Sequence, residues 1–148
     1  MTCTFFGHRN TPREVENKIK EVLDTLIKNQ CVSRFYVGDN GSFDYMVYRA
    51  LGALKQEYPH ICFAKVLAYL PTDKEENSTT DYSNTVFPEG LESVPPRFAI
   101  DKRNRWMIEQ SDIVVVYVKY STGGAAKFAE LAKRRGKTVI NLYQEPQA

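Results

Sequence analysis

Five short apolar runs alternate along the chain with longer segments in which apolar residues recur at helical spacing. The runs cover residues 2–7, 33–38, 62–70, 112–118 and 138–143. They are rich in β-branched and aromatic side chains, and glycine or proline bounds most of them, so we expect each to be a strand. Every residue of the segment 113–118 is apolar. This pattern is typical of a central strand in a parallel sheet, buried on both faces.

The segments between these runs predict four helices. The first begins after Thr11, the expected N-cap, with Pro12 at the first helical position and Glu14 completing a capping box. The others cover about residues 44–58, 101–110 and 125–135, and the last of them ends at Gly136. Strands that alternate with such helices form parallel sheets through crossover connections. The sequence therefore predicts an α/β fold, a Rossmann-like open parallel sheet of about five strands with helices on both faces.

The length of 148 residues fits one domain that spans residues 1–148. One long stretch, residues 71–100, shows no clear helical or strand pattern. Irregular stretches of this length are uncommon inside compact domains, and many of them cover a binding site. We consider two interpretations of equal weight, a lid over a site at the end of the third strand and a surface insertion.

Composition narrows the classes of function. The formal net charge is +2 without a long basic block, so we expect no nucleic-acid partner and no membrane partner. No apolar run is long enough to cross a bilayer, and no signal peptide is visible at the N-terminus. Cys3, Cys31 and Cys62 have no metal-binding spacing. We therefore expect a cytoplasmic protein with no metal and no cofactor.

The candidate chemistry lies in three turns between strands and helices. In an open parallel sheet, ligands bind where strands end and helices begin, which here means residues 7–11, 38–44 and 119–127. In the third turn, Gly123 and Gly124 allow a ligand to approach the main chain closely. The helix that follows offers free N–H groups, so we expect a phosphate near Ala125, with Lys127 as an added charge. A tight turn without a ligand is the alternative.

Polar residues of the three turns supply the other candidates. For Asp39, Asn40 and Asp44, contacts with a ribose or a base compete with ordinary roles in turns and helix caps. His8 is either a ligand donor or a packing residue, and Tyr120 either stacks on a base or lies at a rim. The expected ligand-binding residues are Gly7, His8, Arg9, Gly38, Asp39, Asn40, Gly41, Asp44, Tyr120, Thr122, Gly123, Gly124, Ala125 and Lys127.

The segment "GGAAKFAE" at residues 123–130 resembles the PGGxGTxxE signature of the SLOG superfamily. This superfamily includes the Lonely Guy phosphoribohydrolases and the DNA-processing protein A group. The segment "RNRWM" at residues 103–107 resembles the family's RKxxM segment, so Arg103 and Glu130 match its arginine and its glutamate. The family implies a small stand-alone Rossmann-type domain with a nucleotide ligand. In its hydrolase members, these two residues support cleavage of an N-glycosidic bond in a nucleoside 5′-monophosphate.

The sequence also departs from the hydrolase pattern. No proline precedes the glycines, and Ala126 and Lys127 stand where the hydrolases have Gly-Thr. We therefore rank three functions. The first is binding of a nucleotide or a nucleotide-derived small molecule, as in a sensor, and the second is an N-glycosidase with Arg103 and Glu130 as catalytic residues. The third is an interaction domain without a ligand. We also expect a homo-oligomer, because relatives commonly dimerise beside the site.

Overall fold

The computed structural model describes residues 1–70 and 84–144. Within them, one all-parallel sheet has the strand order β4-β3-β2-β1-β5-β6. The strands are β1 (Thr2–Phe6), β2 (Arg34–Val37), β3 (Cys62–Val66), β4 (Thr85–Val86), β5 (Ile113–Val116) and β6 (Thr138–Asn141). The five predicted strands are confirmed, and so is the Rossmann-like α/β fold class.

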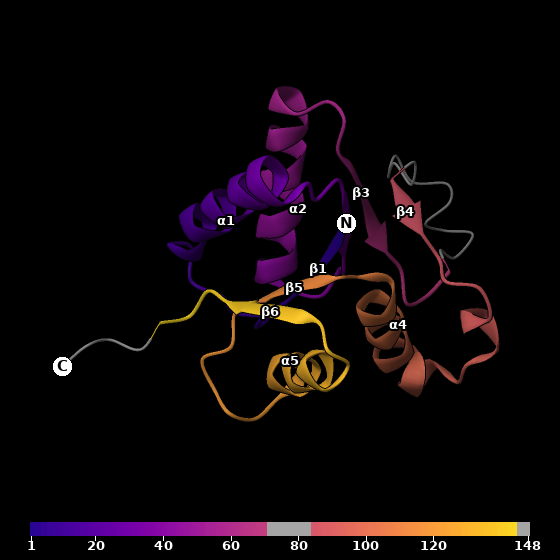
Figure 1. Cartoon of the computed structure of the whole chain (residues 1–148). Coiled ribbons are helices and arrows are strands. Elements are labelled where there is room, and N and C mark those ends of the chain that lie inside the picture. Colours follow the sequence, from indigo (N-terminus) through magenta and orange to yellow (C-terminus); the bar gives the residue numbers. More distant parts are fainter. Residues whose placement is uncertain (71–83, 145–148) are drawn as a thin grey trace.

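Helices cover both faces of the sheet (Figure 1). The helices α1 (Val15–Gln30) and α2 (Ser42–Glu57) lie on one face, and α4 (Pro96–Gln110) and α5 (Gly124–Arg134) lie on the other. Each face has its own hydrophobic core. Ile113 and Val115 of β5 belong to the core under α1 and α2, whereas Val114 and Val116 belong to the core under α4 and α5. The continuous apolar run of β5 is therefore explained by burial on both sides.

Part of the predicted irregular stretch forms regular elements. Residues 84–100 contain β4, a 3-10 turn (Leu91–Ser93) and the first residues of α4. The two residues of β4 are too few to give a periodic pattern, which is why the sequence did not predict this strand. Helix α4 begins at Pro96, five residues before the predicted start, with proline at its first position. Residues 71–83 lie outside the described residues, so the choice between a lid and an insertion stays a prediction.

The ends of two helices differ in how well they were predicted. The capping box at α1 is wrong, because the Thr11 hydroxyl donates to the carbonyl of His8 at 2.6 Å and α1 begins only at Val15. The C-terminus of α5 is as expected. Gly136 has a left-handed φ of 75°, and its amide donates to the carbonyl of Lys133 at 3.0 Å.

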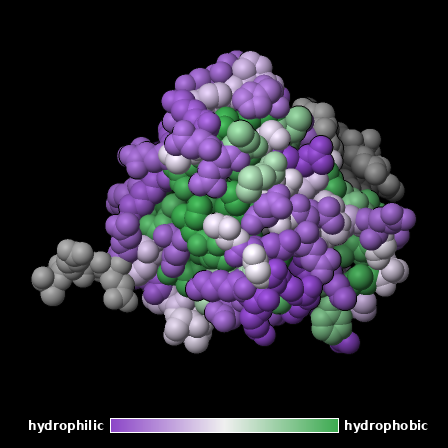
Figure 2. All heavy atoms as spheres, in the orientation of Figure 1, coloured by the Kyte–Doolittle hydropathy of each residue, from purple (hydrophilic) through white to green (hydrophobic). Residues whose placement is uncertain are grey.

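The surface is mostly hydrophilic in the view of Figure 2. Hydrophobic side chains gather between α1 and β6, the strand at one end of the sheet. Val139 and Ile140 of β6 are partly buried, and each packs against the core on its own face of the sheet. Among the described residues, no helix has both the length and the apolar character that crossing a membrane requires.

Candidate functional site

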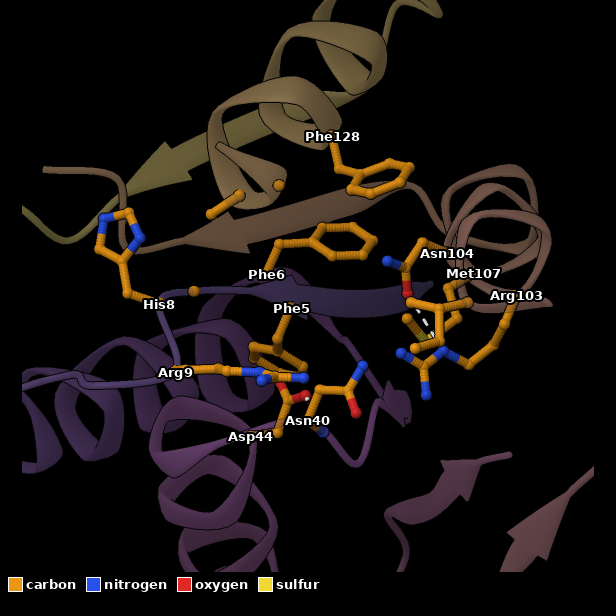
Figure 3. Close-up of a pocket in the computed structure, with 14 residues that line it drawn as sticks. Phe5, Phe6, His8, Arg9, Asn40, Asp44, Arg103, Asn104, Met107 and Phe128 are labelled. Carbon is orange, nitrogen blue, oxygen red and sulfur yellow. Dashed lines mark hydrogen bonds between the residues drawn. The ribbon is translucent and has the colours of Figure 1, made fainter. Parts of the chain in front are cut away.

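A cavity of about 330 Å³ lies where the three predicted turns meet at the carboxyl edge of the sheet (Figure 3). This volume is at the lower end of the range for small-molecule sites, about 300–1,000 Å³. The walls come from the end of β1, the β1–α1 turn, the β2–α2 turn, α4 and the start of α5. The lining residues are Phe5, Phe6, Gly7, His8, Arg9, Asn40, Asp44, Ile100, Arg103, Asn104, Met107, Gly124, Ala125 and Phe128.

The first two turns are bonded tightly to each other. The Ser42 hydroxyl donates to the carbonyl of Arg9 and accepts from the amide of Thr11, both at 2.8 Å, and the Ser42 amide also donates to Arg9 at 2.9 Å. A Cβ added at Gly41 would lie 2.6 Å from the Cα of Arg9, and one at Gly7 would lie 2.2 Å from the ring of Phe43. The absence of a side chain at these two glycines therefore allows the β1–α1 turn to pack closely against the β2–α2 turn and the start of α2.

The third turn is open. A Cβ added at Gly123 or Gly124 would meet nothing within 4 Å. The first hydrogen bond of α5 runs from the amide of Lys127 to the carbonyl of Gly123, at 3.0 Å. No side chain caps the helix, and the amides of Gly124, Ala125 and Ala126 have no hydrogen-bond partner among the described residues. Such amides attract an anion, because they add to the positive end of the helix dipole.

Arg103 lies in the wall that α4 contributes, and only 2% of its surface is exposed. Its Nη1 donates to the Asp39 carboxylate and to the carbonyl of Val66, and its Nε donates to the amide oxygen of Asn104 at 3.1 Å. The guanidinium therefore joins α4 to the β2–α2 turn and to the end of β3. Among the described residues, Nη2 is the only one of the three guanidinium nitrogens without a protein acceptor. Most of the hydrogen-bonding capacity of Arg103 is therefore used by bonds within the protein.

Asp44 is the carboxylate that lines the cavity. It lies in the first turn of α2, and its Oδ2 accepts the amide of Asn40 at 2.9 Å. Burial raises the pKa of the Asp44 carboxyl to about 6, although the bond from Asn40 and the charge of Arg103 act in the opposite direction. Asp39, in contrast, forms the ion pair with Arg103. The two neighbouring aspartates therefore have different partners.

His8 connects the first turn to the third. Its Nε2 accepts the backbone amide of Lys119 at 2.9 Å, and its ring lies 5.3 Å from that of Tyr120 and 5.8 Å from that of Tyr117. Burial lowers the pKa of His8, and the charge of Lys119 lowers it further. An Nε2 that accepts a hydrogen bond belongs to a neutral ring with its proton on Nδ1. The packing interpretation of His8 thus has a direct basis, although the residue also faces the cavity.

The structure divides the predicted ligand-binding residues into two groups. Seven of them line the cavity: Gly7, His8, Arg9, Asn40, Asp44, Gly124 and Ala125. The other seven do not: Gly38, Asp39, Gly41, Tyr120, Thr122, Gly123 and Lys127. The Lys127 ammonium is bonded instead to the carboxylate of Asp101, at 2.6 Å. This ion pair with α4 keeps the ammonium group on the outer surface of the protein.

The structure does not bring Glu130 and Arg103 together. Glu130 is exposed and lines a different cavity, of about 390 Å³, between α5 and β6. Its apolar neighbours on α5 do not shelter it from solvent. Phe128 and Ala129 are buried because they face the sheet, whereas the next position along the helix points away from it. This geometry gives no support to a paired catalytic role within one chain.

Much of the apolar wall of the cavity was not predicted from the sequence. Phe6 and Phe128 stack with their ring centroids 5.4 Å apart and form one side of the cavity (Figure 3). On α4, the lining residues are Ile100, Arg103, Asn104 and Met107. Their spacing of three, four and seven residues is the signature of one helix face, and it could have identified the whole stripe once Arg103 was chosen.

Comparisons by sequence found no match, either with a family model or with a curated protein. Solved structures do match. DNA processing protein A from Streptococcus pneumoniae superimposes with a TM-score of 0.64 at 16% identity, over 95% of this chain and 49% of that chain. The same protein from Helicobacter pylori gives a TM-score of 0.60 at 16% identity, over 98% of this chain and 66% of that chain. The chain thus spans about half to two thirds of these neighbours, and the likeness shows a shared Rossmann-like fold.

These neighbours correct one prediction. The Helicobacter structure is described as showing a single-stranded DNA binding mode, so the exclusion of a nucleic-acid partner from net charge is wrong. A net charge of +2 is an average over the whole surface. Local clusters of cations can create a positive potential even where the total charge is small.

Proposed function

We propose that this chain binds a nucleotide unit in the cavity at the carboxyl edge of its sheet. The observation that carries the proposal is the start of α5, where the amides of Gly124, Ala125 and Ala126 are free of partners in the described chain. Two of these residues line the same cavity as Arg9 and Asp44. The amides at the start of α5 can bind a phosphate, and the polar side chains elsewhere in the cavity can form hydrogen bonds with a sugar. Together they match a phosphorylated sugar.

The roles that we assign follow from these contacts. The phosphate lies against the amides at Gly124 and Ala125, where the helix dipole adds to their attraction. Arg9 adds a positive charge from the β1–α1 turn. Arg103 is a positioning residue, because its bond to Asp39 holds the β2–α2 turn against α4, while its bond to the neighbouring Asn104 fixes the guanidinium. Turnover is not part of the proposal, because Glu130 belongs to a separate cavity.

One pair of variants tests the phosphate contact. Gly124→Pro removes a single amide proton at the first position of α5, where the fixed φ of proline is compatible with a helix. Gly124→Ala keeps the amide and adds a Cβ with nothing within 4 Å. In calorimetry with nucleoside 5′-monophosphates and ADP-ribose, we expect Gly124→Pro to bind about tenfold to a hundredfold more weakly than Gly124→Ala, as for the loss of one hydrogen bond to a charged group.

Three outcomes separate the hypotheses. Weaker binding by Gly124→Pro alone supports the phosphate site. Equal affinities of the two variants would mean that the amide of Gly124 does not contact the ligand. Absence of heat from folded wild-type protein across the whole panel would refute a small-molecule site and favour the interaction domain without a ligand.

Single-stranded DNA is a second candidate ligand, and the likeness to the Helicobacter protein favours it. Binding of a labelled oligothymidylate can be followed by fluorescence anisotropy at several salt concentrations. A strand held by Z phosphate contacts should lose affinity with a slope of about −0.7Z on a double logarithmic plot. Competition by a free nucleotide would show that the strand uses the same cavity, and its failure would place the strand elsewhere.

A further inference from the structure

We propose that Asp44 makes this cavity selective for the sugar: it accepts hydrogen bonds from ribose hydroxyls and so favours ribonucleotides over 2′-deoxyribonucleotides. This inference rests on the proposed nucleotide site and adds to it the class of sugar that the site takes. It also separates the two candidate ligands, because a DNA strand lacks the 2′-hydroxyl.

The hydrogen bonds of Asp44 leave part of its carboxylate for a ligand. Oδ2 accepts the amide of Asn40 at 2.9 Å, and among the described residues no other hydrogen bond or ion pair reaches this side chain. No buried side-chain oxygen or nitrogen in the described chain lacks a partner. The second oxygen, Oδ1, is therefore accessible, and the residue that bears it lines the cavity. An ionised carboxylate only accepts hydrogen bonds, so its ligand partner is a donor such as a hydroxyl.

Asp44 has little structural reason to be an aspartate. A carboxylate in the first turn of a helix gains from the helix dipole, which on its own lowers a carboxyl pKa. At Asp44 burial outweighs every favourable contact, and the pKa rises to about 6. The ion pair with Arg103 belongs to Asp39. The free protein would therefore be more stable with a neutral amide at position 44, and ligand hydroxyls would offset part of the cost of this charge.

The two parts of the cavity have opposite polarity. The open amides at Gly124 and Ala125 are donors and attract an anion, whereas the carboxylate of Asp44 repels a phosphate and attracts hydroxyl donors. A ligand that satisfies both parts carries a phosphate and neighbouring hydroxyl groups on one scaffold. A ribose 5′-phosphate unit has this chemistry, and removal of the 2′-hydroxyl takes away one of the donors that would reach Asp44.

The test compares ribonucleoside 5′-monophosphates with their 2′-deoxy counterparts by calorimetry at pH 8. We expect wild-type protein to bind the better ribonucleotide about tenfold to a hundredfold more tightly than the same nucleotide without its 2′-hydroxyl, the usual value of a hydrogen bond to a charged group. Asp44→Asn should lose most of this ratio and keep its affinity for the deoxynucleotide. The control is Asp24→Asn, which changes a carboxylate on α1 that accepts a hydrogen bond from the Tyr58 hydroxyl. This variant should keep the ratio.

The stability of the variant gives an independent readout. We expect the Tm of Asp44→Asn to exceed that of wild type at pH 8, and this excess should shrink as the pH falls below 6 and Asp44 takes up a proton. A purely structural carboxylate would show the opposite, a lower Tm in the variant. That result would overturn the proposed role of Asp44.

The wild-type protein provides a test that does not depend on the folding of a variant. Between pH 8 and pH 5, protonation of Asp44 should lower the ratio of the ribonucleotide and deoxynucleotide affinities. The charges of Arg103 on α4, Asp39 in the β2–α2 turn and Lys65 on β3 act on the pKa of Asp44, and Arg9 of the β1–α1 turn lines the same cavity. Titration of the phosphate and of other groups affects both nucleotides alike and cancels in the ratio. A ratio that does not change with pH would overturn the inference.

Failure of this inference differs from failure of the proposed function. Equal affinity of wild-type protein for both kinds of nucleotide would refute selection of the sugar and leave the nucleotide site intact. Absence of binding by either kind would refute the site itself.

Discussion

Gly41 and Gly123 have nearly the same backbone conformation, with φ of 103° and 104°, and each stands directly before a helix that no side chain caps. Their surroundings are opposite. At Gly41, the β1–α1 turn lies so close that a Cβ would be 2.6 Å from the Cα of Arg9, whereas at Gly123 nothing lies within 4 Å. At the start of α2, protein already occupies the space in which a ligand would lie. At the start of α5, that space is empty.

The difference shows that a glycine before a helix has two distinct uses. In the β2–α2 turn, it allows two stretches of backbone to touch, and the amide of Ser42 donates to the carbonyl of Arg9 at 2.9 Å. In the β5–α5 turn, it leaves the helix amides free for an anion. The first use builds the wall of the cavity, and the second supplies its binding group.

The largest effect that we expect is from Gly41→Ala, with Gly123→Ala as its matched control. Both variants force a side chain into a conformation that costs about 1–3 kcal/mol. Gly41→Ala adds a clash with the backbone of Arg9, so its free energy of unfolding should fall by about 2 kcal/mol more than that of Gly123→Ala. Urea unfolding of the two variants measures the difference. Equal losses would show that the contact between the first two turns contributes nothing.

A smaller effect is expected from Ser42→Ala. The variant removes the hydroxyl that donates to Arg9 and accepts from Thr11, so the free energy of unfolding should fall by about 1–3 kcal/mol. Ser121→Ala, in the open third turn, is the control and should change stability by less than about 0.5 kcal/mol. A loss of the same size at Ser121 would contradict the view that the bonds of Ser42 to the first turn are what stabilises the protein at this position.

A third expectation concerns acid and the link that His8 makes to the third turn. The folded protein holds the pKa of His8 below its ordinary value of 6.5, so the unfolded chain takes up the proton first. The contribution of neutral His8 to stability should therefore be complete at pH 8. It should decrease as the pH falls below about 6.5 and level off once the folded ring is also charged.

The measurement is the difference in Tm between wild type and His8→Gln across this range, because glutamine does not titrate. The bond from the amide of Lys119 to Nε2 is the contact that protonation breaks. His60→Gln, which changes the other histidine of the chain, serves as the matched control. A difference between wild type and His8→Gln that is constant with pH would contradict the neutral state of His8.

The smallest effect is expected from Gly124→Ala. The added methyl group meets nothing within 4 Å, and alanine favours a helix by up to about 1 kcal/mol over glycine. The variant should therefore be as stable as wild type or slightly more so in urea unfolding. A clear loss of stability would mean that the third turn is packed more tightly than its open geometry implies.

Much of the fold follows from local pattern. The apolar runs predicted β1, β2, β3, β5 and β6, and the all-apolar run of β5 predicted its burial on both faces. The strand β4 was not predicted because two residues are too few to show a periodic pattern. The early start of α4 was not predicted because the proline at its first position was assigned to a loop. The homo-oligomer and the single domain over residues 1–148 stay predictions.

The site was predicted less completely. Topology alone brings the ends of β1, β2 and β5 to one edge, which is why the sequence was enough to predict the three glycine-bearing turns of the site. Which glycines face protein and which face open space depends on distances between segments that lie far apart in the sequence, as with Gly41 and Arg9. The separation of Glu130 from Arg103 depends on the rotation of α5 against the sheet, and a signature of residue types contains no information on that rotation.

The sequence by itself determined the alternation of strands and helices, the burial of β5 and the location of the polar turns, because periodicity and turn chemistry are properties of neighbouring residues. Tertiary structure alone decided that Arg103 holds the Asp39 carboxylate while Asp44 faces the cavity. The two aspartates lie five positions apart and are chemically identical. Their different burial and different partners arise only when α4 packs against the β2–α2 turn, and that contact gives one of them a structural role and leaves the other available to a ligand.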